Sequence, residues 1–304
     1  MENIKLENYN EDRFETAIAL GNFDGVHIGH KKLILNMVEN AKNLSLKPSI
    51  LLFDNHTKMV TSGEAPMCIT SNIQKERLVK NLGVEIIYRI NFDENLMRLQ
   101  PEEFVKNILV DKLNTKLVVV GFDYRFGHKA SADVEVLKEL GIKYGFKVIV
   151  LEPIYIDDVI VSSTKIRELI LEGNLELANI MLDRNYQLTG KVISGNKIGR
   201  TLGFPTANLE LMDNYTIPKY GVYRTKTIID DRTYLSATSV GYNPTFNNDN
   251  VKIECHIIDF EDKIYDQIIH VDFIEYLREE IKFDKLDDLI NQIDNDIKTV
   301  ISRH

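Results

Sequence analysis

The stretch Gly21-Asn22-Phe23-Asp24-Gly25-Val26-His27-Ile28-Gly29-His30 decides the fold of the first half of the chain. A short apolar run, Thr16 to Leu20, precedes it, and apolar positions at helical spacing, from Leu33 to Ala41, follow it. A strand, a glycine turn and a helix in this order direct free backbone N–H groups and the positive end of the helix dipole at the turn. The sequence therefore predicts an anion-binding site, with phosphate as the expected ligand class.

The histidines of this stretch indicate what the site does with phosphate. His27 and His30 can each hydrogen-bond a phosphate oxygen, and near pH 7 each can carry charge where negative charge builds up. Transfer of an adenylyl group to a phosphate anion needs positioning and charge neutralisation, and no carboxylate base. The alternative is that both histidines are loop residues or metal ligands.

Working outward, the first ~180 residues alternate strand and helix, which predicts a parallel sheet with helices on both faces and ligands at one edge. Expected strands lie at residues 16–20, 49–53, 85–90, 116–120 and 147–151. Expected helices follow residue 32, cover 73–80, open at Pro101 and span 133–143. Short helices are then expected after Ser162 and over 175–182.

A second polar group, Ser162, Ser163, Thr164 and Arg167, marks the start of one of these helices. Hydroxyls at a helix start together with an arginine on the first turn could hold a triphosphate tail from the side opposite the histidines. The alternative is an ordinary N-cap followed by a surface arginine.

The pattern changes near Asp183 to Tyr186, so we expect domains at residues 1–184 and 185–304. From Gln187 to Phe273 the segments are short, alternating and punctuated by Gly, Pro, Asn and Asp, which is typical of a small antiparallel β-barrel. An amphipathic helix over 286–297 closes the chain.

The barrel segment contains a second phosphate signature, from Gly195 through Gly199 and Gly203 to Pro205-Thr206-Ala207-Asn208. Its glycines permit close approach of backbone to phosphate. On an extended chain Thr206 and Asn208 face one side, and their oxygens suit Mg²⁺ held between protein and phosphates. The signature lacks the Gly-Lys-Ser/Thr ending of a Walker A loop.

An alcohol acceptor needs a general base, and Glu254 is the candidate. It lies in a strand-like segment, Val251 to Ile257, that otherwise suits a core, where a carboxylate is costly to bury. The alternative is that Glu254 points outward on an alternating strand.

Composition sets the class of protein. The hydrophobic fraction of 44% and charged fraction of 27% are those of a globular protein, and the net charge of -9 argues against a nucleic-acid or anionic-membrane binder. No apolar run is long enough for a transmembrane helix, and the first residues lack the apolar region of a signal peptide. The two cysteines, Cys68 and Cys255, favour a reducing cytoplasm. The sequence does not fix the oligomeric state.

Together these motifs resemble the bacterial bifunctional riboflavin kinase/FMN adenylyltransferase family, the FAD synthetases. The resemblance includes Gly121 to Gly127, Gly221 to Tyr223, Gly241 to Phe246 and Glu254 to Phe260, and covers nearly the whole chain. It implies a Rossmann-like nucleotidyltransferase domain followed by a riboflavin-kinase barrel. It also implies ATP and Mg²⁺ as cofactors, and riboflavin, FMN and FAD as substrates and products.

The resemblance assigns roles by position. It implies that Glu254 deprotonates the ribityl 5′-hydroxyl and that Thr206 and Asn208 bind Mg²⁺ and phosphate. Residues implied to bind ATP for adenylylation are Gly21, Phe23, Asp24, His27, Gly29, His30, Asp123, Ser162, Ser163, Thr164 and Arg167. Residues implied to bind FMN there are Asn22, His56, Asp123 and Arg125. In the kinase, Gly195, Gly199, Gly203, Pro205 and Arg278 are implied to contact ATP or flavin, with Phe273 to Arg278 forming a helix along the flavin pocket.

The chain departs from the family pattern in one stretch. Phe53-Asp54-Asn55-His56-Thr57 keeps the histidine of Phe-Asp-Pro-His-Pro and lacks both prolines, which would otherwise fix φ. This leaves open a kinase whose adenylyltransferase half is weakened. A non-catalytic flavin-binding regulator is a second alternative. A cytidylyltransferase-like enzyme is a third, but it would leave the barrel motif without a role.

Overall fold

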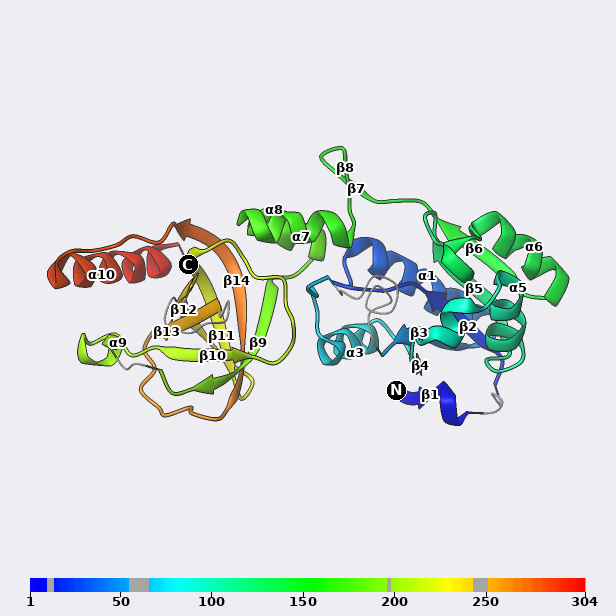
Figure 1. Ribbon diagram of the computed structural model, residues 1–304, viewed down its shortest axis with the longest axis horizontal. Helices are drawn as coiled ribbons and strands as arrows, with labels where there is room; N and C mark the ends of the chain where they lie inside the picture. Colours follow the sequence, from blue (N-terminus) through cyan, green and yellow to red (C-terminus); the bar gives the residue numbers. More distant parts are fainter. Residues whose placement is uncertain (10–13, 55–65, 196–197, 243–250, 304) are drawn as a thin grey trace. The chain divides into compact units, whose positions relative to one another are not determined.

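The computed structural model describes residues 1–9, 14–54, 66–195, 198–242 and 251–303 of the chain (Figure 1). They form two compact units. The first contains Met1–Pro66 and Thr70–Ser162, and the second contains Met67–Ile69 and Ser163–His304. No helix in the described part of the chain is long and apolar enough to cross a membrane.

A six-stranded parallel sheet forms the centre of the first unit, as the alternation of strand and helix predicts. Its strand order is β1-β4-β3-β2-β5-β6. The strands are β1 (Glu2–Lys5), β2 (Thr16–Leu20), β3 (Lys47–Phe53), β4 (Ile86–Ile90), β5 (Thr115–Gly121) and β6 (Lys147–Leu151). Each expected strand is present within two residues of its expected bounds. The edge strand β1 was not expected, because four mostly exposed residues carry no clear alternation.

Helices cover both faces of this sheet because the side chains of its strands alternate between two cores. On β2, Ala17 and Ala19 belong to one core, and Ile18 and Leu20 to the other. Helices α1 (Ile28–Asn43) and α3 (Asn72–Asn81) pack into the first core. The second core is covered by α5 (Pro101–Phe104), the π-helix η2 (Val105–Val110) and α6 (Val134–Tyr144). The remaining short elements are η1 (Leu6–Asn8), α4 (Glu94–Arg98), η3 (His128–Ala130), β7 (Tyr155–Ile156) and β8 (Val159–Ile160).

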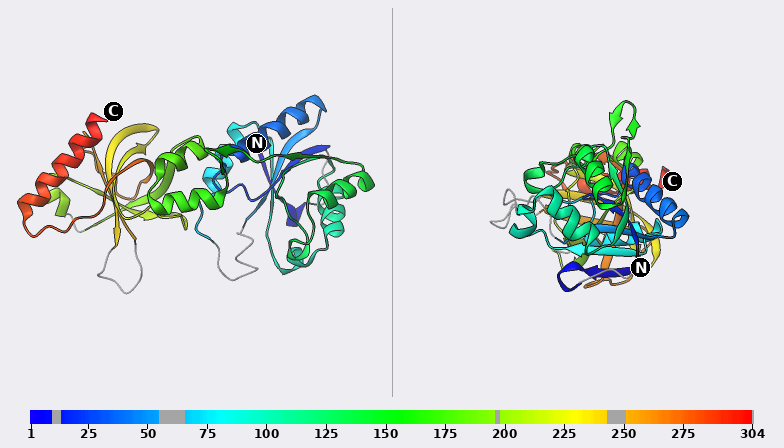
Figure 2. Two further views of the ribbon diagram at one scale, coloured as in Figure 1. Left: turned by 90° about the horizontal axis from the view of Figure 1, so that it is seen from above. Right: turned by 90° about the vertical axis from the view of Figure 1, so that its right-hand side faces the viewer.

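The second unit contains a closed antiparallel barrel, which confirms the expectation for this half of the chain. Its order is β10-β13-β12-β11-β14-β9. The strands are β9 (Tyr186–Ile193), β10 (Ala207–Leu211), β11 (Gly221–Ile229), β12 (Arg232–Tyr242), β13 (Val251–Ile257) and β14 (Ile268–Arg278). The unit also contains α7 (Ser163–Glu172), α8 (Leu175–Leu182), α9 (Ile198–Thr201) and α10 (Leu286–Ser302), and α10 packs against β12 (Figure 2).

The helix expected over Phe273 to Arg278 is wrong, because these residues belong to strand β14. Ile269, Val271 and Phe273 are buried while the residues between them are partly exposed, which is the two-residue period of a strand. The segment also pairs with β9 and β11 on its two sides. Pairing across the barrel therefore decides its conformation.

The two compact units meet in the chain at Ser162/Ser163, earlier than the expected boundary at 184/185. Helices α7 and α8 belong to the barrel unit. The side-chain amide of Asn179 on α8 donates to the Phe273 carbonyl oxygen at 2.9 Å, and its oxygen accepts from the Tyr186 backbone N–H at 2.7 Å. The catalytic modules, as distinct from these packing units, are still predicted at 1–184 and 185–304.

A cluster of hydroxyl groups and one thiol lies inside the barrel. The Thr225 hydroxyl lies 2.8 Å from that of Ser236 and 2.7 Å from that of Thr238. The Thr227 and Thr238 hydroxyls lie 2.9 and 3.3 Å from Cys255 Sγ. Burial raises the pKa of the Cys255 thiol, so it stays protonated within this network.

Replacing Thr238 by valine is expected to destabilise the barrel by about 1–3 kcal/mol, because it leaves buried groups of Thr225 and Cys255 with fewer partners. Urea denaturation followed by circular dichroism measures the change. Thr233→Val is the matched control, since Thr233 is exposed on the same strand. Equal stabilities of the two variants would contradict a contribution from the network.

Candidate active sites

The first candidate site lies where the strand order of the sheet reverses. The chain passes from β2 to β3 on one side, while β5 lies on the other side of β2. In open parallel sheets, ligands bind beyond the carboxyl ends of the strands at such a point. The turn after β2 begins at Gly21 and β5 ends at Gly121, so the two glycine-led motifs of this unit meet at that edge.

An unusual turn connects β2 to α1. Phe23, Gly25 and Val26 all have positive φ, at 49°, 82° and 40°, a region that a β-branched residue such as valine rarely adopts. The buried Phe23 and Val26 side chains belong to the core beneath α1. Oδ1 of Asp24 accepts the Thr70 backbone N–H at 3.1 Å, and the Gly25 N–H donates to the Thr70 hydroxyl at 3.0 Å. Core packing and these bonds hold the turn, while the expected contacts of Phe23 and Asp24 with ATP stay predictions.

The two histidines lie together at the start of α1. His27 is the N-cap, and its Nδ1 accepts the His30 backbone N–H at 3.4 Å. The rings stack with centroids 3.7 Å apart, and no side chain at Gly29 intervenes. Nδ1 of His30 is buried with no hydrogen-bond partner among the described residues. Burial, then the charges of His27 and Lys75, lower the pKa of His30 well below 6.5, so this ring is neutral at pH 7.

The structure describes some, but not all, of the other residues expected to bind nucleotide or flavin in this unit. Asp123 and Arg125 are exposed after β5, with the Asp123 carboxylate turned back beside Gly121. His56 lies outside the described residues, as do Asn55 and Thr57.

The serine and arginine group lies at the passage between the two units. Ser162 ends the first unit and Ser163 begins α7 in the second, followed by Thr164. Arg167 donates from Nε to the Met67 carbonyl oxygen at 3.0 Å. Since each unit is described by itself, the expected position of this group opposite the histidines stays a prediction.

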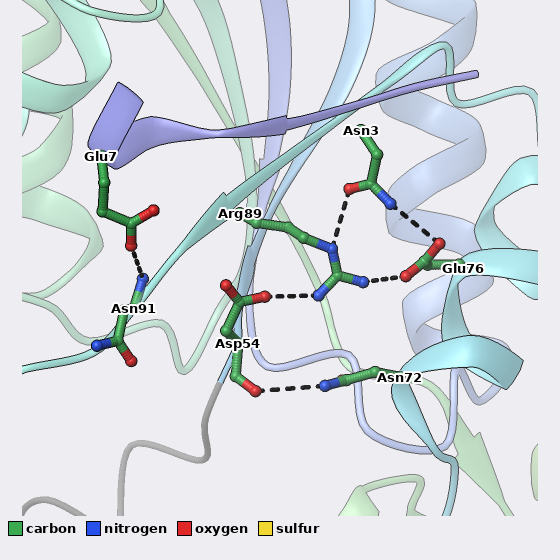
Figure 3. A network of polar contacts seen from close by, with 7 residues as sticks. All are labelled: Asn3, Glu7, Asp54, Asn72, Glu76, Arg89 and Asn91. Atoms are coloured by element: carbon green, nitrogen blue, oxygen red, sulfur yellow. Dashed lines mark hydrogen bonds and ion pairs between the residues drawn. The ribbon is translucent and has the colours of Figure 1, made fainter. Parts of the chain in front are cut away.

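A buried arginine holds the far side of the first site together. Arg89 on β4 donates from Nε to Asn3 at 2.9 Å and pairs with Asp54 at 2.7 Å and with Glu76 of α3 (Figure 3). Asn72 of α3 also donates to the Asp54 carbonyl oxygen at 3.3 Å. One guanidinium thus connects the end of β3 with helix α3.

Replacing Arg89 by methionine is expected to lower the free energy of unfolding by about 2 kcal/mol, because two carboxylates lose charge-assisted hydrogen bonds. The matched control is Lys138→Met, which removes an exposed ion pair with Glu135 and should cost less than ~1 kcal/mol. Thermal unfolding of both variants provides the comparison. An equal effect of the two substitutions would contradict a structural role for the network.

The second candidate site lies on the outer side of the barrel. Asn208 on β10 pairs directly with Glu254 on β13, so both side chains share a face. The neighbours of Glu254 on its strand, Ile253 and Cys255, are buried. Glu254 therefore points outward, and Asn208 points to the same side. The Glu254 carboxylate pairs with Lys252 at 2.8 Å.

Close packing fixes the phosphate signature beside Glu254. A side chain at Gly195 would overlap the Asn208 amide, which explains the glycine. Nδ1 of His256, two residues after Glu254, lies 2.9 Å from the Pro205 carbonyl oxygen. Thr206 is exposed immediately before β10. Gly199 lies within the short helix α9, and Gly203 follows two residues after its end.

Two family models match the two halves of the chain. The sequence model of the FAD synthetase family matches residues 9–165, and that of riboflavin kinase matches residues 182–303. A bifunctional riboflavin kinase/FMN adenylyltransferase of Listeria monocytogenes is 38% identical, over 92% of this chain and 90% of the relative. One from Buchnera aphidicola subsp. Schizaphis graminum is 34% identical, over 97% and 96%. This chain belongs to the bifunctional riboflavin kinase/FMN adenylyltransferase family.

A solved structure of the same architecture exists for a Streptococcus pneumoniae protein described as a macrolide-efflux protein. It has a TM-score of 0.91 and 31% identity, and the match covers 99% of each chain. The likeness extends over both units. The efflux description is that of the pneumococcal protein, and neither matching family model concerns efflux.

The barrel site fits the magnesium ion that the family uses. Thr206 and Asn208 offer hydroxyl and amide oxygens, hard ligands that Mg²⁺ prefers. The described residues contain no group of three or more His, Cys, Asp or Glu able to hold a metal. An ion held by few protein oxygens and completed by nucleotide phosphates does not require one.

Arg278, expected at the flavin pocket, pairs with Asp296 of α10 at 2.6 Å. It therefore anchors α10 to β14, and its contact with flavin stays a prediction. The sequence reasoning did not single out Lys75 or His256. His256 could have been found, because a two-residue period on a strand places it beside Glu254. Lys75 lies in an ordinary helical pattern, and only the fold brings it to the histidines.

Proposed function

We propose that this chain catalyses both steps from riboflavin to FAD. The barrel unit transfers the γ-phosphoryl group of ATP to riboflavin, and the sheet unit transfers AMP from a second ATP to FMN with release of pyrophosphate. The observation that carries the proposal is the presence of two different phosphate sites in one family member: a histidine pair at a helix start, and an outward carboxylate opposite Asn208.

Adenylyl transfer at the sheet unit requires no proton removal from its nucleophile. A phosphate oxygen of FMN attacks the α-phosphorus of ATP, and the bond to the bridging oxygen breaks with its electron pair leaving on pyrophosphate. Nδ1 of His27 accepts the His30 backbone N–H, so a neutral His27 ring carries its proton on Nε2, and this N–H would donate to a phosphate oxygen. His30 adds a neutral hydrogen-bonding group beside it.

Phosphoryl transfer at the barrel unit starts from an alcohol and therefore needs a base. Glu254 accepts the proton of the ribityl 5′-hydroxyl as its oxygen attacks the γ-phosphorus of ATP. Lys252 orients this carboxylate in the ligand-free chain. Thr206 and Asn208 would hold Mg²⁺, which when bound neutralises charge on the ATP phosphates.

Product analysis tests the proposal. Purified protein is incubated with riboflavin, ATP and Mg²⁺, and the flavins are separated by chromatography; FMN and FAD are both expected. FMN without FAD, also when FMN is supplied directly, would favour the kinase with a weakened adenylyltransferase half. The replacement of two family prolines by Asn55 and Thr57 motivates this second candidate. Absence of both products would contradict the proposal and would leave a non-catalytic flavin-binding regulator as the alternative function. The proposal includes a cytoplasmic location and small molecules, with no nucleic acid, as partners.

A further inference from the structure

Lys75 lies in the first site although no sequence motif includes it. It is on the first turn of α3, and the residue is only 9% exposed. Its Nζ donates to the carbonyl oxygen of Asn22 at 3.2 Å. Asn22 is the second residue of the turn after β2, so the lysine amine lies at the phosphate-binding edge of the sheet.

The charge of Lys75 acts on the histidine pair. Its ammonium is one of the two charges that lower the pKa of His30, the other being that of His27. The nearby Asp24 carboxylate accepts hydrogen bonds from Thr70. A neutral His30 supplies hydrogen bonds and no charge at pH 7. The Lys75 ammonium places positive charge at this edge.

Helix α3 fixes the position of Lys75 before any ligand arrives. Ser71 and Gln74 form a capping box at its start, with bonds of 2.8 and 3.1 Å. Glu76, the next residue, pairs with Arg89 of β4 (Figure 3). A charge held in place by such contacts needs no reorganisation during the reaction, which is the condition for electrostatic catalysis.

We propose that Lys75 is a further catalytic residue of FMN adenylylation, with its ammonium group contacting the phosphates of ATP at the reacting α-phosphorus. The inference rests on the proposed function. As the bond between the α-phosphorus and the bridging oxygen breaks, negative charge moves onto pyrophosphate, and Lys75 stabilises that charge. No proton transfer from Lys75 is involved.

The test compares Lys75→Gln, which keeps a hydrogen-bond donor, with Lys75→Arg, which keeps the charge. FMN and ATP are supplied to the full-length chain, and kcat, both KM values and inhibition by pyrophosphate are measured. Lys75→Gln is expected to lower kcat for FAD formation from about tenfold to about 10²-fold and to weaken pyrophosphate inhibition. Lys75→Arg should recover much of the loss. The matched control is Lys80→Gln on the exposed side of the same helix, which should retain full activity.

The controls separate the possible failures. Phosphorylation of riboflavin by the same variants reports that the chain is folded and should be unchanged. Unchanged kcat in Lys75→Gln, or a rise in the KM for FMN alone, would overturn the inference. Equal losses in the Gln and Arg variants would also overturn it, because the lysine would then only hold Asn22. Absence of FAD with the unmodified chain would instead contradict the proposed function.

Discussion

Glu254→Gln is expected to lower riboflavin phosphorylation by about 10³-fold while conversion of FMN to FAD continues. Removal of a general base costs roughly 10²–10⁴-fold in rate, and an alcohol nucleophile depends on that base. Glutamine keeps the size of the side chain and can remain opposite Asn208, so the loss would report basicity alone. Separate assays with riboflavin and with FMN as the starting flavin measure the two steps.

Glu210→Gln is the matched control for this substitution. Glu210 is exposed on β10, two residues from Asn208, and pairs across the ladder with Lys191. It changes the charge of the same barrel face and should leave both activities intact. Loss of both activities in a folded Glu254→Gln protein would contradict the division of the two steps between two sites. Full kinase activity of that variant would exclude Glu254 as the base.

Helices and strands could be predicted from the sequence where their hydrophobic periodicity ends at residues that favour a turn. Strands 16–20 and 147–151 and the helix at 175–182 have their expected bounds, because a short apolar run or one apolar helical stripe leaves a clear pattern. Phe273 to Arg278 was assigned to a helix by resemblance, but these residues pair with β11 within strand β14. That residues 163–182 pack with the barrel unit could not be seen in the sequence, because it depends on the bonds of Asn179 to β14 and β9.

The candidate sites also combine motifs that one segment contains with contacts between segments far apart in the sequence. The resemblance placed Asn208 and Glu254 in one site, and their pairing across the barrel is in agreement with it. Glu254 points outward, as the alternative reading expected, and its role as the base stays a prediction. The charge state of His30 could not be predicted from the sequence. His30 is neutral because burial, His27 and Lys75 act on it, and these neighbours come from a turn and a helix far apart in the sequence.

His30→Ala is expected to lower the rate of FAD formation by about 10²–10³-fold and to leave the kinase unchanged. The estimate follows from removing one preorganised hydrogen-bonding group at a site where charge develops. Since the ring is neutral at pH 7, His30→Asn should retain more activity than His30→Ala. His128→Ala, which removes a histidine bonded to the Met97 backbone in the same unit, is the control. Equal losses in the Asn and Ala variants would indicate that a charged imidazole is required.

The lowered pKa of His30 also predicts how stability depends on pH. In the unfolded chain this histidine takes up a proton near pH 6.5, whereas in the folded protein it does so only at a lower pH. The unfolded state therefore binds more protons in that interval, so acid lowers the free energy of unfolding as the pH falls below 6.5. His30→Asn removes this contribution, and urea denaturation at pH 7.5 and 5.5 measures it. If the variant lost as much stability on acidification as the unmodified chain, the surroundings of His30 would not hold its ring neutral. The imidazoles could then carry the charge that phosphate binding needs, and no further cation would be required.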